Sequence, residues 1–255
     1  MPWEHLVPPV LYKYLPPERL HVLPECRVRF SQRSTFRDDH ELQPDFAAFG
    51  TEDEIRRIID SAEDLRDLRI SRDNLARLIA TNSEYKKLAM EGVQRGMPTL
   101  QESGVFCLSE RADCEQMWHE YAGGGKGFVV TFDTTHPGFD RLKTPGLIGR
   151  VSYNDEPFGT FLGAKETEGA GIFFRKRMQY SFEREWRSIR PLHRLEHHPG
   201  DIFLSPFDPA SIREIIIRPD CVLRGILCNL TTTDERYKYV QIVPLGELAS
   251  RQGPR

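Results

Sequence analysis

The chain has 255 residues, of which 39% are hydrophobic and 29% are charged, and its formal net charge is −3. This balance indicates a globular protein with a sizeable core, and it excludes general nucleic-acid binding driven by the charge of the whole molecule. The sequence has no apolar run long enough for a membrane span, and its start lacks a secretory signal pattern. We therefore expect a cytoplasmic protein that does not bind membranes.

The first part of the chain predicts short strands followed by helices. Residues 11–14 (LYKY) lie between pairs of prolines and predict an extended segment, and residues 28–31 alternate apolar and polar side chains like a strand. From residue 51 to residue 96 the pattern becomes amphipathic and helical, with a capping box formed by Thr51 and Glu54. We expect three highly charged helices that form an insertion on one side of a sheet.

The stretch from residue 104 to residue 133 concentrates the strongest signals. Short apolar runs at 105–108 and 128–130 predict buried strands. Between them, Trp118 and Tyr121 share one face of a short helix that leads into the sequence GGGKG. The lysine of this run is followed by glycine instead of Ser or Thr, and the run precedes its strand, so it predicts a flexible turn and not a phosphate-binding loop.

The last hundred residues predict further strands and a polar tail. The expected strands are residues 147–153, 202–204, 212–217 and 239–243. Beyond residue 245 the polar sequence predicts a frayed end. Taken together, the elements predict a single α+β domain over residues 1–255, with a central mixed or antiparallel sheet and the helical insertion at 51–96.

A second group of candidate functional residues follows residue 174. Apolar residues recur every four positions as far as Phe182, which predicts a helix, and the residues after it alternate like a strand. In an extended segment Glu183, Glu185 and Arg187 would lie on one face. The Cα atoms of the two glutamates would then be about 6–7 Å apart by the rise of a strand.

Two patterns bear on metal binding. The string from His193 to His197 (HRLEH) matches the HxxEH motif of inverted zinc peptidases. The prolines on both sides leave barely two helical turns, so we expect no metal there. The five cysteines contain no CxxC pair, which predicts neither a zinc site nor a disulfide framework.

Several motifs together resemble a bacterial family called domain of unknown function 2971. The motifs LYKY, CLSE, MWHEYA, KGFVVTFD, VSY, FEREWRSI and EIII follow one another in the order of that family. The family usually has Asn-Asp-Pro where this chain has Arg-Asp-Asp around Asp38, and Trp-Ser-His-Tyr where this chain has Trp-His-Glu-Tyr from Trp118 to Tyr121. The resemblance implies a shared fold, but the family name carries no activity.

The order of strands and motif residues is also similar to the layout of ADP-ribosyltransferase folds. That similarity implies an enzyme that uses NAD as a substrate, cleaves the nicotinamide–ribose bond and transfers ADP-ribose to an unidentified acceptor, macromolecular acceptors included. A carboxylate near the ribose would stabilise the positive charge that develops as the bond breaks. The implied catalytic residues are Glu185, Glu183 and Tyr121, with Glu185 the first candidate for contacting the ribose. The implied residues for binding this small-molecule nucleotide are Tyr12, Lys13, Tyr14, Ser31, Trp118 and Arg187.

Two other interpretations stay open. A hydrolase or phosphodiesterase would hold a divalent ion with Asp38, Glu183 and Glu185. A non-catalytic sensor or interaction module would instead use Arg187 to form an ion pair with a glutamate beside a structural Trp186. A nucleotide cleft would favour the transferase, a metal between carboxylates the hydrolase, and the absence of a cleft the interaction module.

Overall fold

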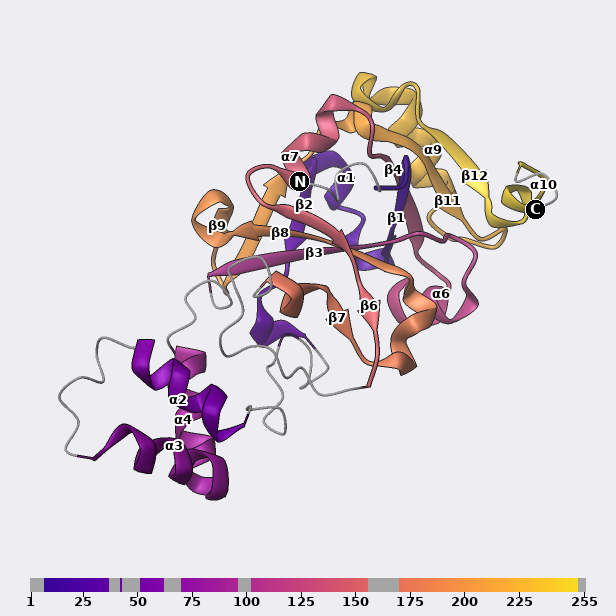
Figure 1. Ribbon diagram of the computed structural model, residues 1–255. Helices are drawn as coiled ribbons and strands as arrows, with labels where there is room; N and C mark the ends of the chain where they lie inside the picture. Colours follow the sequence, from indigo (N-terminus) through magenta and orange to yellow (C-terminus); the bar gives the residue numbers. More distant parts are fainter. Residues whose placement is uncertain are drawn as a thin grey trace.

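The computed structural model describes residues 7–36, 42, 51–61, 70–95, 102–155 and 170–251. Its main feature is a seven-stranded sheet in the order β12-β11-β4-β1-β3-β8-β5 (Figure 1). The strands are β1 (Val10–Leu15), β3 (Ser103–Ser109), β4 (Phe128–Asp133), β5 (Leu147–Arg150), β8 (Glu185–Pro191), β11 (Ile212–Ile217) and β12 (Gln241–Pro244). Neighbouring strands are antiparallel except β11 and β12, which are parallel. The predicted α+β fold with a central mixed sheet is confirmed.

Two smaller sheets accompany the main one. An antiparallel sheet is formed by β2 (Arg27–Phe30), β10 (Ile202–Pro206) and β9 (Glu196–His198). A parallel pair is formed by β6 (Ser152–Tyr153) and β7 (Arg175–Lys176). The second of these brings two segments that are distant in sequence to the edge of the main sheet where β8 begins (Figure 1).

Buried side chains pack on both faces of the main sheet, because successive side chains of a strand point to opposite sides. On one face a row of aromatic rings packs with centroids 5.5–6.1 Å apart. These rings are Phe30, Phe106, Phe132, Phe139 and Phe207. On the other face α6 (Glu115–Tyr121) packs Trp118 edge-on against Tyr14 of β1, with ring centroids 5.7 Å apart.

One edge of β3 changes its partner along its length. At its end, Ser109 lies opposite Tyr12 of β1. Nearer its start, Val105 exchanges backbone hydrogen bonds with Ser31, the residue that follows β2. Cys107 lies between these two positions, and its carbonyl accepts a hydrogen bond from Lys13 Nζ at 2.8 Å. The three-stranded sheet of β2, β10 and β9 therefore joins the main sheet at this point.

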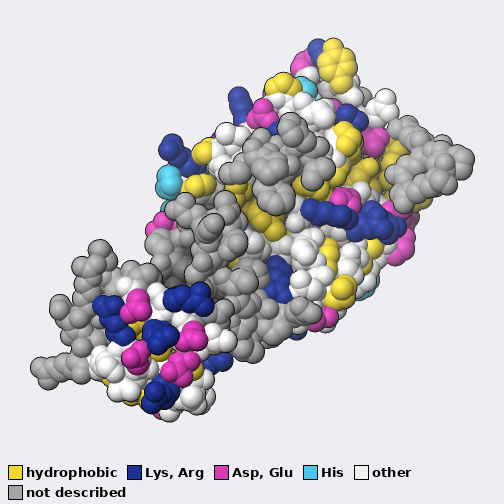
Figure 2. Space-filling model, in the orientation of Figure 1, with side chains coloured by type: hydrophobic (Ala, Val, Ile, Leu, Met, Phe, Trp, Pro, Cys, Tyr) yellow, Lys and Arg dark blue, Asp and Glu magenta, His cyan; other side chains and the backbone are white. Residues whose placement is uncertain are grey.

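The predicted helices of residues 51–96 are present as α2 (Glu52–Ser61), α3 (Arg72–Thr81) and α4 (Ser83–Arg95). They have an apolar cluster of their own, formed by Ile55, Ile59, Ala76 and Ile79. Figure 1 shows them as a group beside the sheet, and Figure 2 shows basic and acidic side chains interspersed on their visible surface. Some of these opposite charges form ion pairs, such as Arg56–Asp53 and Arg72–Asp60.

Several elements differ from the sequence-based expectation. The expected helix before Phe182 is a 3-10 helix, η8 (Met178–Glu183). The expected polar tail contains a helix, α10 (Leu245–Arg251), because Leu248 is buried against the face that carries Trp118. Three helices had no clear sequence signal: α1 (Val22–Glu25), α7 (Asp140–Lys143) and α9 (Arg224–Thr233). The remaining 3-10 helices are η2 (Pro17–Arg19), η3 (Arg33–Thr35), η6 (Pro137–Phe139), η7 (Ala170–Phe174), η9 (Leu192–Arg194), η10 (Pro209–Ser211) and η11 (Glu235–Tyr237).

Within the described ranges, none of the helices combines the length and the apolar character that are needed to cross a bilayer.

Candidate active site

Glu183 and Glu185 meet at the start of β8, but they are not neighbours on one strand. Glu183 is the last residue of η8, and β8 begins at Glu185. Arg184 between them has left-handed backbone angles, with φ 43° and ψ 53°. The prediction of an extended segment from residue 183 is therefore wrong, because this left-handed residue bends the chain. The bend still directs both carboxylates toward the same ammonium group, that of Lys176 on β7.

The buried charges of this site alternate in sign. Lys176 Nζ donates to Glu183 Oε2 at 2.7 Å and lies 3.4 Å from Glu185 Oε2. Arg187 donates from Nε to Glu185 Oε1 at 2.9 Å and from Nη2 to Glu185 Oε2 at 3.0 Å. Each carboxylate therefore has a cation beside it, and their attraction offsets part of the cost of removing these charges from water. We call Glu183, Lys176, Glu185 and Arg187 the charge chain.

Three partly exposed tyrosines surround the charge chain. Tyr121, at the end of α6, donates its hydroxyl to Glu183 Oε1 at 2.6 Å. The hydroxyl of Tyr153, on β6, accepts a hydrogen bond from the backbone N–H of Glu185 at 2.7 Å. Lys176 Nζ lies 4.9 Å from the centre of the Tyr180 ring, a distance at which cation and ring attract one another. The charge chain is therefore enclosed by aromatic side chains that reach the surface.

The pKa values of the two carboxyl groups are driven apart. Burial, helped by the charge of Glu185, raises the pKa of Glu183 to about 7 against the opposing effect of Lys176. Burial also acts to raise the pKa of Glu185, but the charges of Arg187 and Lys176 outweigh it and hold that pKa well below its ordinary value. Burial and the neighbouring Glu183 raise the pKa of Tyr121, so this hydroxyl stays a neutral donor. A pair of carboxyl groups with separated pKa values is typical of acid–base sites.

The sequence-predicted site residues fall into two groups. Glu183, Glu185, Arg187 and Tyr121 come together as expected, through the contacts given above. The other predicted residues make their hydrogen bonds elsewhere. Trp118 is fully buried and its indole N–H donates to the Ala112 carbonyl at 2.7 Å.

Three predicted NAD-binding residues lie on β1, and a fourth, Ser31, follows β2 and pairs with β3. The hydroxyl of Tyr14 donates to the Arg111 carbonyl at 2.9 Å, and Lys13 donates to the Cys107 carbonyl. Tyr12 is half-buried opposite Ser109, and Ser31 pairs with β3 through its backbone. Burial lowers the pKa of the Lys13 ammonium. In the described part of the chain, none of the four donates a side-chain hydrogen bond to Glu183 or Glu185.

Lys176, Tyr153 and Tyr180 were not predicted as site residues. Lys176 is the middle residue of the run Arg175-Lys176-Arg177, and nothing in the composition of this run marks which side chain turns inward. The parallel pairing of β7 with β6 decides it, since that pairing buries Lys176 beside Tyr153. Tyr153 ends the motif VSY, so this motif was the available signal.

The geometry also bears on metal binding. Asp38, a ligand in the hydrolase interpretation, lies outside the described residues. The place between Glu183 and Glu185 where a divalent ion would sit holds the Lys176 ammonium. His193 lies on η9 and His197 on β9, where it stacks on Phe203 with ring centroids 4.7 Å apart. Among the residues described, no group of three or more His, Cys, Asp or Glu side chains is placed to hold a metal ion.

The raised pKa of Glu183 predicts a pH-dependent stability. Because the folded-state pKa of about 7 lies above the ordinary value of 4.5, the contribution of Glu183 favours folding below pH 4.5 and is lost as the pH rises through 7. We expect the free energy of unfolding of the wild type, minus that of Glu183→Gln, to fall by about 2–3 kcal/mol between pH 5 and pH 8. Urea unfolding of both proteins at the two pH values measures this difference. A difference that stays constant with pH would show that Glu183 titrates normally.

The charge chain and its tyrosines thus form a site with one firmly ionised carboxylate and one that titrates near neutral pH. Comparison of the chain with protein-family models, with curated proteins and with solved structures gave no match, so the function has to be argued from this geometry.

Proposed function

We propose that the protein is an NAD-consuming enzyme that cleaves the nicotinamide–ribose bond, with Glu183 as the carboxylate that acts on the ribose. The observation that supports this proposal is the pair of carboxyl groups around Lys176, one of which has a pKa of about 7. A carboxyl group that titrates near neutral pH is a suitable reacting group, and its hydrogen-bond partner Tyr121 is partly exposed.

The chemistry requires a negative charge near the ribose. Departure of nicotinamide leaves positive charge on the ribose ring, and a carboxylate held beside it lowers the energy of that transition state. The ionised form of Glu183 would supply the charge, and the tyrosine rings would supply flat surfaces for stacking the nicotinamide.

The proposal assigns different roles to the two glutamates. Both oxygens of Glu185 accept hydrogen bonds from Arg187, which is completely buried, so Glu185 has little freedom to approach a ligand. Glu185 is instead a positioning residue that acts through Lys176. The first candidate from the sequence was Glu185, and the contacts of Tyr121 favour Glu183.

A second candidate function is a non-catalytic interaction module. The closed pair of hydrogen bonds between Glu185 and Arg187 favours it, because such a pair is complete without a ligand. The metal-dependent hydrolase has less support, since the Lys176 ammonium already lies between the two carboxylates. The rest of the proposal consists of predictions from the sequence: membership of the domain of unknown function 2971 family, a cytoplasmic location and a macromolecular acceptor.

The proposal is tested by incubating the purified chain with NAD, with and without host cell extract as a source of acceptors, and measuring released nicotinamide. Because the reaction needs the ionised form of Glu183, kcat/KM should rise with pH and level off above an apparent pKa near 7. NAD should also raise the melting temperature of the protein, since a ligand that binds only the folded state stabilises it. A protein that neither binds nor consumes NAD under any of these conditions would contradict the proposal and leave the interaction module.

A further inference from the structure

A pocket lies on the side of β8 that faces away from the charge chain. Successive residues of a strand alternate in direction, so Ser188 and Arg190 point away from the face that carries Glu185 and Arg187. On that opposite side β8 is covered by α7, where Ser188 donates its hydroxyl to the Leu142 carbonyl and Arg190 donates to the Arg141 carbonyl. A small ligand in this pocket is therefore separated from Glu183 by the sheet, and the pocket is distinct from the proposed active site.

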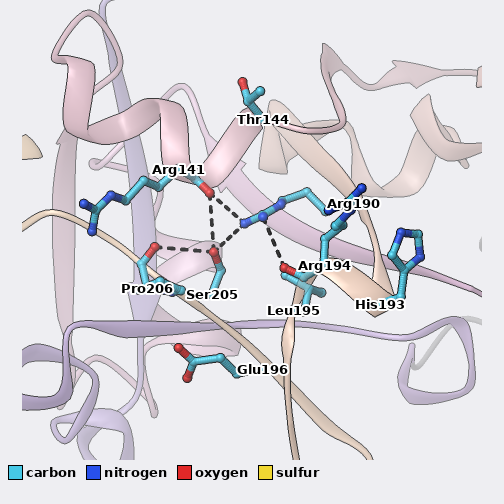
Figure 3. Close-up of a pocket in the computed structure, with 9 residues that line it drawn as sticks. All are labelled: Arg141, Thr144, Arg190, His193, Arg194, Leu195, Glu196, Ser205 and Pro206. Carbon is cyan, nitrogen blue, oxygen red and sulfur yellow. Dashed lines mark hydrogen bonds between the residues drawn. The ribbon is translucent and has the colours of Figure 1, made fainter.

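The pocket has a volume of about 460 Å³, within the range of roughly 300–1,000 Å³ found for small-molecule sites. Figure 3 shows Arg190 at its centre, with its guanidinium directed toward Ser205 and the carbonyls of Arg141 and Arg194. His193 and Glu196 also line it. The pocket can therefore hold a ligand larger than a single ion.

The central guanidinium is buried without a counter-charge. Arg190 is 7% exposed, and its hydrogen bonds go to neutral oxygens: from Nη1 to the Arg141 carbonyl at 2.7 Å and to Ser205 Oγ at 2.5 Å, and from Nη2 to the Arg194 carbonyl at 3.3 Å. Its Nε–H has no partner within the described part of the chain. Burial lowers the pKa of Arg190. A buried cation in this position is costly unless an anion joins it.

Besides Arg190, the lining of the pocket contains two further arginines and one glutamate. The exposed guanidinium groups of Arg141 and Arg194 form no ion pair with any residue that the structure describes. The carboxylate of Glu196 is already neutralised, because it accepts a hydrogen bond from Arg27 Nε at 2.6 Å. Figure 3 places Glu196 apart from the Arg190 guanidinium. Three arginines thus line the pocket, and Glu196, the carboxylate among its lining residues, is already paired; in Figure 3 the guanidinium of Arg141 is directed away from that of Arg190.

We propose that this pocket binds the phosphate group of a small phosphorylated molecule, with Arg190 as the fixed charge at its base and Arg141 and Arg194 as mobile charges at its rim. Guanidinium groups match the oxygens of a phosphate with parallel N–H donors, and a doubly charged phosphate balances several arginines better than a single carboxylate does. The volume beyond the phosphate accommodates a sugar or nucleoside.

The test is isothermal titration calorimetry of the full chain with inorganic phosphate, with a nucleoside 5′-monophosphate and with citrate, at low ionic strength. We expect both phosphate compounds to bind, and each of the variants Arg141→Gln and Arg194→Gln to weaken their binding about tenfold, as expected when a charge-assisted contact is removed. Arg224→Gln is the matched control, because Arg224 is an exposed arginine on α9 outside the pocket. It should bind like the wild type.

The Arg190→Gln variant should not bind either phosphate compound. Because Arg190 is buried, the circular dichroism spectrum of this variant is compared with that of the wild type to check that it folds. The two exposed variants decide the matter if this variant does not fold. The proposal is overturned if the wild type binds neither phosphate compound, if the pocket variants bind as tightly as Arg224→Gln, or if citrate binds as tightly as the phosphate compounds. Glu183→Gln should bind phosphate like the wild type, so loss of NAD cleavage and loss of phosphate binding are separate outcomes.

Discussion

Glu183→Gln is expected to lower the rate of NAD cleavage by about a hundredfold or more while the protein stays folded. Glutamine cannot carry the negative charge that the proposed transition state needs. It still fills the same space: its carbonyl oxygen can accept the hydrogen bond of Lys176, and its amide N–H can donate to the Tyr121 oxygen. Well below pH 4.5 the substitution should change stability little, because the carboxyl group is then neutral in both the folded and the unfolded protein. At pH 7 it should raise the stability, because the folded protein disfavours the ionised form of Glu183.

The measurement is the rate of nicotinamide release at saturating and at low NAD, for the wild type, Glu183→Gln and a control. Glu235→Gln is a suitable control, because Glu235 is an exposed glutamate on η11 whose ion pair with Lys238 lies outside the site. The control should keep the wild-type rate. A Glu183→Gln protein that cleaves NAD as fast as the control would remove Glu183 from the mechanism.

Glu185→Ala is expected to destabilise the protein by about 3–5 kcal/mol, the range found when one partner of a buried ion pair is removed. Its partner Arg187 is fully buried, and Nε and Nη2 of its guanidinium bond to Glu185. Without that carboxylate, the guanidinium keeps the carbonyl of Phe173 as a partner, which carries no opposing charge. Urea unfolding at pH 7 measures the loss of stability.

Glu196→Ala is the matched control for this second experiment. Glu196 also pairs with an arginine, Arg27, at 2.6 Å, but both side chains are about 40% exposed. Water replaces the lost contact there, so the change in stability should be much smaller than for Glu185→Ala. Equal effects of the two substitutions would mean that the burial of Arg187 does not govern the cost of losing its partner.

The sequence predicted the strands better than it predicted how they meet. Continuous apolar runs such as Phe128–Val129–Val130 specify a buried strand by themselves, and β4 is found there. The helix α9 was missed because its sequence RGILCNLTTT contains a glycine and four β-branched residues, which favour helix weakly. Its helical form is fixed by packing, with Leu227 fully buried against the main core. Tertiary packing of this kind leaves no signal in the local sequence.

The candidate site shows the same limit at the level of single residues. The pattern identified Glu183, Glu185 and Arg187 as a group because their spacing is two. It placed them on one strand, since an arginine is rarely found in the left-handed conformation that Arg184 adopts. Lys176 was missed because it reaches the carboxylates from β7, a strand of two residues that is too short to predict. A local sequence pattern can thus indicate which charged residues belong to a site, but it does not predict which of them form ion pairs in the fold.

Where β3 changes its pairing partner, Lys13 supplies a hydrogen bond that no strand provides. Where one strand edge passes from one sheet to another, backbone groups between the two ladders have no strand to pair with, and a buried carbonyl left that way would be costly. Cys107 is at that junction, and the ammonium of Lys13 takes the place of the missing strand. The same ammonium lies 5.0 Å from the centre of the Phe106 ring, which ties it to the aromatic face of the core. The lysine of the motif LYKY thus has a structural role at the junction of two sheets, independent of any ligand.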